Sequence, residues 1–179
     1  MSAARFLVIL CTGALAAAAA PASAQGQMAD AAATCAAPAD LPAPLASWRA
    51  PVPLRAATAA RGLKAATLTP GQSVTLALAR TPDVAYPLRP AKPGGSVSYG
   101  GLTRFTVDKP GTWRVALSTA AWVDVVRDGA ALQSIAHGHG PDCTGVRKMV
   151  DFTLSPGEYT IQVAANGADS ITLLVTPLP

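Results

Sequence analysis

The sequence has few of the side chains on which most enzyme chemistry depends. Its 179 residues include only two histidines and three cysteines. Both histidines lie in the segment 137–143, which reads His-Gly-His-Gly-Pro-Asp-Cys, so any site that needs imidazole must be built there. Serine or cysteine nucleophile chemistry is disfavoured too, because no nucleophile-elbow motif is present.

Nucleic-acid recognition is also disfavoured. Basic residues gather between positions 41 and 82, where no acidic residue occurs. No pattern of interleaved aromatic residues and no nucleic-acid-binding motif accompanies them. We interpret this stretch as a solvated basic edge, with weak attraction to anionic envelope surfaces as the alternative.

A strongly apolar run occurs at the N-terminus, where residues 1–24 have the pattern of a secretory signal peptide. Arg5 precedes the apolar residues 6–15, and Ala22-Ser-Ala24 offers a cleavage site before Gln25. The run is shorter than the roughly 20 residues that a membrane-spanning helix needs. We therefore expect a periplasmic or secreted mature protein with no transmembrane segment.

Cleavage would leave two cysteines, Cys35 and Cys143, which lie 108 positions apart. Disulfides persist in exported proteins, so we predict that these two cysteines pair. The bond would join the N-terminal segment to the His-Gly-His loop. The alternative is a reduced Cys143 thiolate that contributes to a metal site.

The mature chain divides by composition at about residue 64. Residues 25–64 are rich in alanine and proline, and the prolines predict extended or polyproline-like backbone. We expect the beginning of this segment to be disordered and its later part to be a strap that docks on the core through apolar residues such as Trp48 and Leu45.

Residues 65–179 show the two-residue alternation of β-strands, separated by turns that contain glycine or proline. In one strand, Trp113 and Val115 alternate with Arg114 and Ala116. Asp128-Gly129 predicts a hairpin turn, with a return strand from Ala130 to Ile135. At least seven such strands and no convincing helix predict an all-β fold, a single antiparallel β-sandwich or jelly roll, and nothing in the pattern suggests a parallel sheet.

The C-terminal part resembles a known type of exported domain. Its motifs are Gly111-Thr-Trp-Arg-Val-Ala-Leu117, Val123-Asp-Val-Val-Arg-Asp-Gly129 and the run from Phe152 to Val163 that contains Ser-Pro-Gly-Glu-Tyr. Together they resemble the bacterial pre-peptidase C-terminal type of β-sandwich over most of residues 100–176. Such domains are non-catalytic accessory or binding modules, so the resemblance implies binding.

A second resemblance involves the segments 94–101, 136–143 and 147–152. They look like a group of small exported alphaproteobacterial proteins, mostly uncharacterised, some of which are labelled homogentisate 1,2-dioxygenase. That label implies a cupin-like, non-haem iron enzyme. The chain would then need two imidazoles and a carboxylate around one ion.

The residues that would have to form this site are His137, His139 and Asp142, with Glu158 as an alternative carboxylate. In extended backbone the two histidines point to the same side, so one Fe or Zn ion is the implied cofactor. The spacing differs from a cupin, however, because only Gly140 and Pro141 separate His139 from Asp142 and no later histidine exists. The competing interpretation is a compact, disulfide-stapled loop without a metal.

A polar binding patch is the other candidate site. We expect Trp113 to lie in the core, whereas Trp122 begins a strand at a turn and is the better candidate for exposure. Asp124 and Arg127 lie near Trp122 in sequence, and Tyr99 lies in a glycine-rich segment. The sequence thus predicts an exported, non-catalytic binding or accessory protein of the cell envelope with an unidentified ligand or envelope partner, and a metal-dependent dioxygenase as the alternative.

Overall fold

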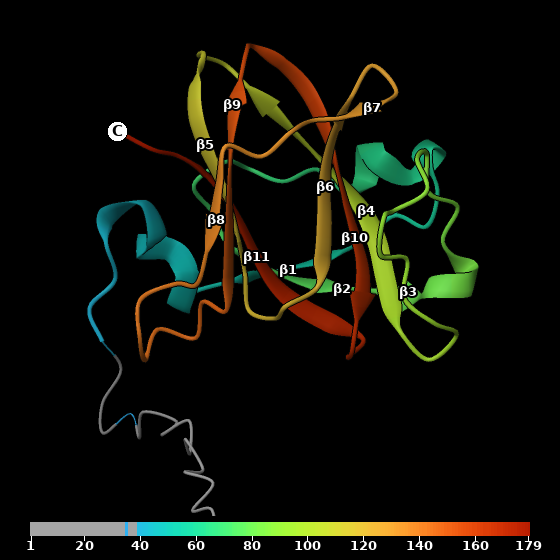
Figure 1. Ribbon diagram of the computed structural model, residues 1–179, viewed down its shortest axis with the longest axis horizontal. Helices are drawn as coiled ribbons and strands as arrows, with labels where there is room; N and C mark the ends of the chain where they lie inside the picture. Colours follow the sequence, from blue (N-terminus) through green and yellow to red (C-terminus); the bar gives the residue numbers. More distant parts are fainter. Residues whose placement is uncertain (1–34, 36–38) are drawn as a thin grey trace, which may run out of the picture. The chain divides into compact units, whose positions relative to one another are not determined.

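The computed structural model describes Cys35 and residues 39–179, and its strands form two sheets that pack face to face (Figure 1). The predicted signal peptide and most of the predicted disordered segment lie outside the described residues. Within the part that is described, no helix is both long and apolar enough to cross a membrane.

The first sheet has six strands in the order β1-β2-β11-β5-β9-β8. Their bounds are β1 Val52–Arg55, β2 Val74–Ala77, β5 Gly111–Leu117, β8 Ala136–Gly138, β9 Lys148–Leu154 and β11 Ser170–Pro177. The pairs are antiparallel except β1 and β2, which run parallel. The sequence did not predict this parallel pair, because β1 lies in the proline-rich strap.

The second sheet has five strands in the order β3-β4-β10-β6-β7, all antiparallel. Their bounds are β3 Ala79–Arg80, β4 Tyr99–Val107, β6 Trp122–Arg127, β7 Ala130–Ala131 and β10 Gly157–Asn166. The prediction of an all-β, mainly antiparallel β-sandwich is confirmed.

The core lies between the two sheets and follows the predicted alternation. In β5, Trp113, Val115 and Leu117 are buried in the main core cluster, whereas Ala116 faces the other side of the sheet. Burial of a large apolar side chain stabilises a fold by about 1.5–3 kcal/mol relative to leaving it exposed. The alternation therefore fixes the register of each strand, since a slip by one residue would turn this face outward.

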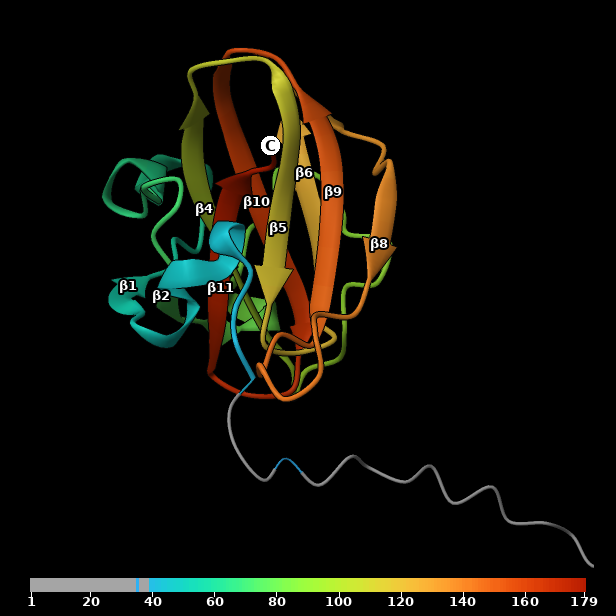
Figure 2. The same ribbon diagram turned by 90° about the vertical axis from the view of Figure 1, so that its left-hand side faces the viewer.

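Within the proline-rich strap, the segment around Trp48 packs on the outer face of the six-stranded sheet, and the strap is not polyproline-like throughout. Residues Ala43–Arg49 form a 3-10 helix, η1, and Ala60–Ala65 form a second one, η2. Leu45 and Trp48 of η1 are buried against Ala116 and Leu174. Figure 2 shows this segment in front of β11 and β5. Prolines at the start of a helix need no backbone donor there, so they permit the short helix that the proline count seemed to exclude.

The glycine-rich segment 94–101 ends in a strand, because β4 begins within it at Tyr99. A Cβ atom on Gly101 would clash with the Cβ of Ala56, and one on Gly100 would clash with the Tyr86 hydroxyl. Because these two glycines have no Cβ, the strap at Ala56 and the loop that carries Tyr86 can lie directly on β4.

The Asp128-Gly129 hairpin forms as predicted, with φ values of 52° and 77° that suit a tight turn. The predicted return strand is wrong in length, because β7 spans only two residues. Leu132 N still donates to Val125 O in the five-stranded sheet, whereas Ile135 N donates to Asp151 O in the six-stranded sheet. The chain thus crosses from one sheet to the other within three residues.

Candidate functional site

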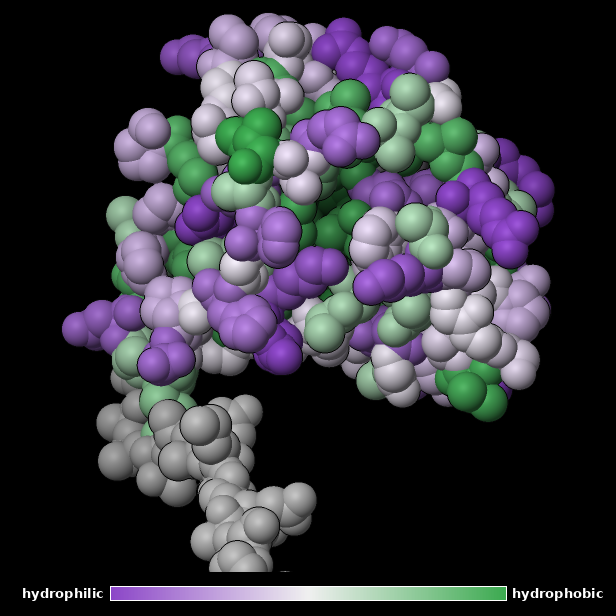
Figure 3. Space-filling model, in the orientation of Figure 1, coloured by the Kyte–Doolittle hydropathy of each residue, from purple (hydrophilic) through white to green (hydrophobic). Residues whose placement is uncertain are grey.

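This crossing forms one wall of an open side of the sandwich, between β8 and β6. A hollow of about 290 Å³ lies there, and we call it the apolar hollow. Its lining combines the apolar residues Val123, Leu132, Val150 and Phe152, the aromatic ring of Trp122, and the polar side chains of Gln133, Ser134, His137 and Lys148. Figure 3 shows the hollow on this face, with hydrophobic surface inside it and hydrophilic residues around it.

Trp122 stands at the start of β6 at the edge of the apolar hollow and is half-buried. The Nζ atoms of Lys92 and Lys148 each lie 5.5 Å from the centroid of its ring. Its indole Nε1 donates to Asp124 Oδ1 at 2.9 Å. Two cations and a carboxylate therefore hold the ring in place, since the π-face attracts cations and the indole N–H needs an acceptor.

Lys148 is the more enclosed of the two lysines. It lies opposite Leu117 in the pairing of β9 with β5, so its stem points to the core side, and its Nζ donates to Ala121 O at 2.9 Å. Burial lowers the pKa of Lys148, the charge of Lys92 lowers it further, and Asp124 acts in the opposite direction. An added negative charge near this amine would be stabilised by the same two lysines.

A second hollow, which we call the basic hollow, adjoins the first. It has a volume of about 240 Å³ and is lined by Ala120, His137, Gly138, His139, Arg147 and Lys148. His137 and Lys148 line both hollows. His137 pairs with the buried Val150 across β8 and β9, which turns its side chain towards the open side of the sandwich. We refer to the two hollows together as the groove.

The loop after β8 is compact and covalently fixed. Cys35 and Cys143 form the predicted disulfide, with an S–S distance of 2.06 Å. Gly140 N donates to Val146 O at 3.1 Å, and Thr144 Oγ1 donates to Pro141 O at 2.6 Å. The interpretation of residues 137–143 as a stapled loop agrees with these contacts.

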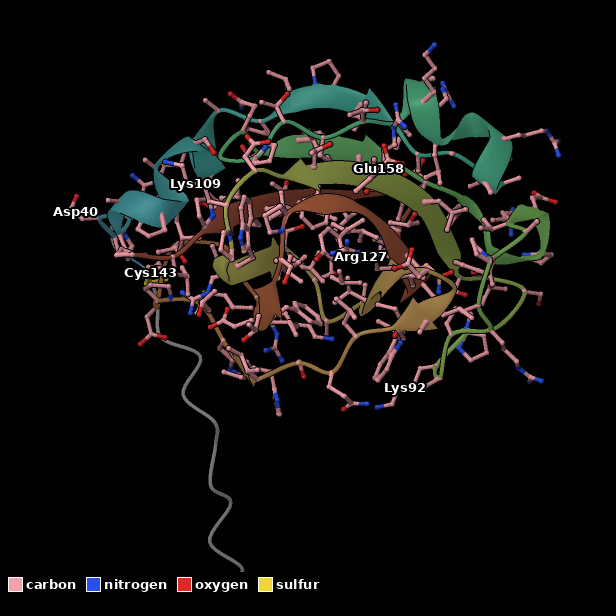
Figure 4. All side chains as sticks on the ribbon, turned by 90° about the horizontal axis from the view of Figure 1, so that it is seen from above. Asp40, Lys92, Lys109, Arg127, Cys143 and Glu158 are labelled. Carbon is pink, nitrogen blue, oxygen red and sulfur yellow. A yellow bond between two sulfur atoms is a disulfide. The ribbon has the colours of Figure 1, made fainter. Side chains whose placement is uncertain are left out.

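The proposed metal ligands do not meet in the way that an iron site requires. His137 and His139 both line the basic hollow, but Asp142 lines the next hollow along the loop, together with His139 and without His137. Within the described residues, no three or more His, Cys, Asp or Glu side chains are grouped so that they could hold a metal ion. Glu158 is bound instead by Arg104 Nη1 at 2.7 Å, and Figure 4 shows it far from Cys143. The residues present therefore do not fit the non-haem iron centre that the dioxygenase alternative implies.

The four residues of the predicted binding patch are only partly brought together. Trp122 and Asp124 are hydrogen-bonded partners at the groove. Arg127 lies at the other end of β6, where its Nη1 donates to the Tyr159 hydroxyl at 2.9 Å, and Figure 4 shows it pointing inward while Lys92 lies at the periphery. Tyr99 lies on β4, which β10 separates from β6, and its ring lies 5.7 Å from the guanidinium carbon of Arg80.

Three residues of the site escaped the sequence analysis: Lys92, Lys148 and Gln162. Lys92 lies in a proline-containing loop with no periodic pattern, so no local signal marks it. Gln162 follows the alternation of β10, in which Tyr159 and Ile161 face the core, so the sequence places it on the outward face and gives no sign that it is buried. It is fully buried, and its amide is hydrogen-bonded to the main chain of Leu88, in the loop that carries Lys92. Its Nε2 also lies 3.4 Å from Asp124 Oδ2, so Gln162 connects this loop to the partner of Trp122.

Comparisons with known proteins find distant likeness among solved structures. No protein-family model matches this sequence, and no curated protein matches it. The solved pre-peptidase C-terminal domain of a collagenase from Bacillus anthracis is similar, with 14% identity and a TM-score of 0.38 over 70% of this chain and 95% of that domain. It is the type of domain that residues 100–176 resemble in sequence. At this level of similarity, function has to be argued from the residues of the chain itself.

Proposed function

We propose that this protein is an exported, non-catalytic binding protein of the cell envelope and that its ligand occupies the groove. The observation that carries the proposal is Trp122, a half-buried aromatic side chain at the edge of a hollow with an apolar interior and polar surroundings. Small-molecule sites commonly combine an apolar lining with a few polar groups that fix the ligand's orientation.

Export is supported by two independent features. Residues 1–24 have the signal-peptide pattern, and the Cys35–Cys143 disulfide is typical of proteins outside the reducing cytoplasm. Fractionation of cells that express the full chain tests this part. We expect a processed form beginning at Gln25 in the periplasm or medium, whereas an intact N-terminus in the cytosol would overturn it.

Binding is tested with the mature protein and the uncharged apolar dye Nile red. We expect saturable fluorescence enhancement that Leu132→Gln reduces by about tenfold, because replacement of the two methyl groups of Leu132 by an amide removes about 1.6 kcal/mol of apolar contact. Leu54→Gln is the matched control, since Leu54 is also half-buried against the core but lies on β1, away from the groove. Absent dye binding, or equal binding by the two folded variants, would contradict the proposal.

A separate measurement tests the proposal that the protein is non-catalytic. Metal content and oxygen consumption with homogentisate are determined for the mature protein and for a His137→Ala, His139→Ala double variant. We expect substoichiometric metal and no oxygen uptake. Stoichiometric iron and oxygen consumption that both disappear in the double variant would establish the dioxygenase instead.

A further inference from the structure

The basic hollow has an unusual charge composition. Of its six lining residues, four carry nitrogen side chains, namely His137, His139, Arg147 and Lys148, and none carries a carboxylate. The other two, Ala120 and Gly138, are small and leave space between these groups. Such a wall attracts negative charge, because converging donors stabilise an anion best where solvent is partly excluded.

The positive charges at this end of the groove are not neutralised by ion pairs. The pairs within 4.0 Å among the described residues use Arg104, Arg114 and Arg127. Arg147, Lys148 and Lys92 belong to none of them. Asp124 is the acidic residue whose charge raises the pKa of Lys148, and its carboxylate already accepts a hydrogen bond from the indole of Trp122.

A single acidic residue, Asp142, lines the next hollow along the loop, together with His139 and Arg147. It lies in the loop that the disulfide fixes, and it is exposed. Together, Asp142 and Asp124 supply two negative charges against the three positive charges of Arg147, Lys148 and Lys92. The net charge around the basic hollow is therefore positive.

The basic hollow is continuous with the apolar one, since both are lined by His137 and Lys148. A ligand that fills the groove therefore meets cations at one end and Val123, Leu132, Val150 and Phe152 at the other. We infer that the groove binds an organic anion, whose carboxylate or phosphate group lies among His137, Arg147 and Lys148 and whose apolar body lies in the apolar hollow. This inference rests on the proposed binding function and specifies its ligand class.

Titration calorimetry with three eight-carbon probes tests the charge preference: octanoate, 1-octanol and octylammonium. We expect octanoate to bind the mature protein at least about tenfold more tightly than the other two, because a charge-assisted hydrogen bond contributes about 1.5–3 kcal/mol. Equal or tighter binding of octylammonium or 1-octanol would overturn the inference.

Arg147→Gln provides the residue-level test, because Arg147 is exposed and can be changed without a cavity. We expect it to weaken octanoate binding about fivefold or more and to leave 1-octanol binding unchanged. Arg55→Gln is the matched control, since Arg55 is an exposed arginine on β1, at the opposite edge of the same sheet from β8. Equal losses in the two variants would contradict a specific anion site.

Two further results separate the possible outcomes. Sedimentation with phosphatidylglycerol vesicles distinguishes a lipid source of the anion from a soluble acid: Arg147-dependent vesicle binding points to the lipid, and Arg147-dependent octanoate binding without it points to the soluble acid. If Leu132→Gln weakens Nile red binding about tenfold while neither anion binds, the anion inference fails and the binding function stands. If no probe binds at all, both fail.

Discussion

Gln162 holds the main chain of Leu88 through both ends of its side-chain amide. Leu88 N donates to Gln162 Oε1 at 3.1 Å, and Gln162 Nε2 donates to Leu88 O at 3.1 Å. Gln162 is fully buried on β10, whereas Leu88 belongs to the loop between η3 (Thr81–Asp83) and β4. The same loop carries Lys92 to Trp122, so this pair of hydrogen bonds positions one cation of the groove.

Replacement of Gln162 by leucine should therefore loosen this loop. The backbone N–H and C=O of Leu88 would lose their partners, which we expect to reduce the free energy of unfolding by about 2–3 kcal/mol. Lys92 should also leave Trp122, which would change the tryptophan fluorescence of the folded state. Urea unfolding and emission spectra measure the two effects.

Gln72→Leu is the control for this substitution. Gln72 also donates to main-chain oxygens, those of Ala50 and Ser73, but it is not fully buried. We expect a loss of only about 0.5–1.5 kcal/mol there. Equal destabilisation by the two substitutions would argue against the anchoring role of Gln162.

Gly101→Ala should destabilise the protein because of the close approach of the strap. The added Cβ would collide with Ala56 Cβ, and neither backbone can easily shift, because Gly101 pairs with Val163 and Ala56 N donates to Ala77 O. Overpacking of this kind typically costs about 1–3 kcal/mol. Gly95→Ala in the same glycine-rich segment is the control, since nothing lies within 4 Å of its added Cβ. Thermal unfolding of both variants tests the prediction, which a neutral Gly101→Ala would refute.

Tyr86 predicts how stability changes at alkaline pH. Burial raises the pKa of Tyr86 from 10.0 to about 12, against a smaller lowering by its hydrogen bond with Thr81. The fold thus favours the protonated phenol, which donates to Val163 O at 2.9 Å. Its contribution is fully present below pH 10, where the unfolded chain also holds the proton, and is lost as the pH rises through about 12.

The measurement is urea unfolding between pH 9 and pH 12, with tyrosinate absorbance recorded in parallel. Tyr86→Phe should be less stable than the wild type at pH 9, and the difference should shrink towards pH 12. A difference that stays constant over this range would show that the ionisation of Tyr86 is not linked to folding.

The disulfide predicts a large effect of reduction. Because Cys35 and Cys143 are separated by 108 positions, the entropic model gives a stabilisation of up to about 4–5 kcal/mol. We expect a Cys35→Ser, Cys143→Ser variant to unfold at a lower urea concentration, and denatured, unreduced mature protein to contain no free thiol. Two titratable thiols in that sample would contradict the bond.

The strands were predictable where burial alternates along the chain. Trp113, Val115 and Leu117 define β5 by themselves, and the Asp128-Gly129 turn follows from its backbone requirements. The 3-10 helix Ala43–Arg49 and strand β1 were not predictable in the same way. Both depend on contacts with distant residues, such as Leu174 for η1 and the edge of β2 for β1, and these contacts override the local preference that proline imposes.

The candidate site was less predictable than the fold. The sequence indicated Trp122 and Asp124, which are two positions apart on one strand and therefore share a face. It did not indicate Lys92, which reaches Trp122 from another loop, and it grouped Arg127 with them although that side chain points to the core side. Local periodicity determines which way a side chain faces, but not which distant segment comes to meet it.

The Cys35–Cys143 bond has a mechanical consequence. It closes the chain between these residues into a covalent ring that contains β1 to β8 and leaves β9, β10 and β11 outside. Tension applied between the two ends of the chain would bypass the ring and act on residues 144–179. β9, which supplies Lys148 and Val150 to the groove, lies outside the ring, so tension would detach it while the eight strands inside the ring stayed limited in extension by the disulfide.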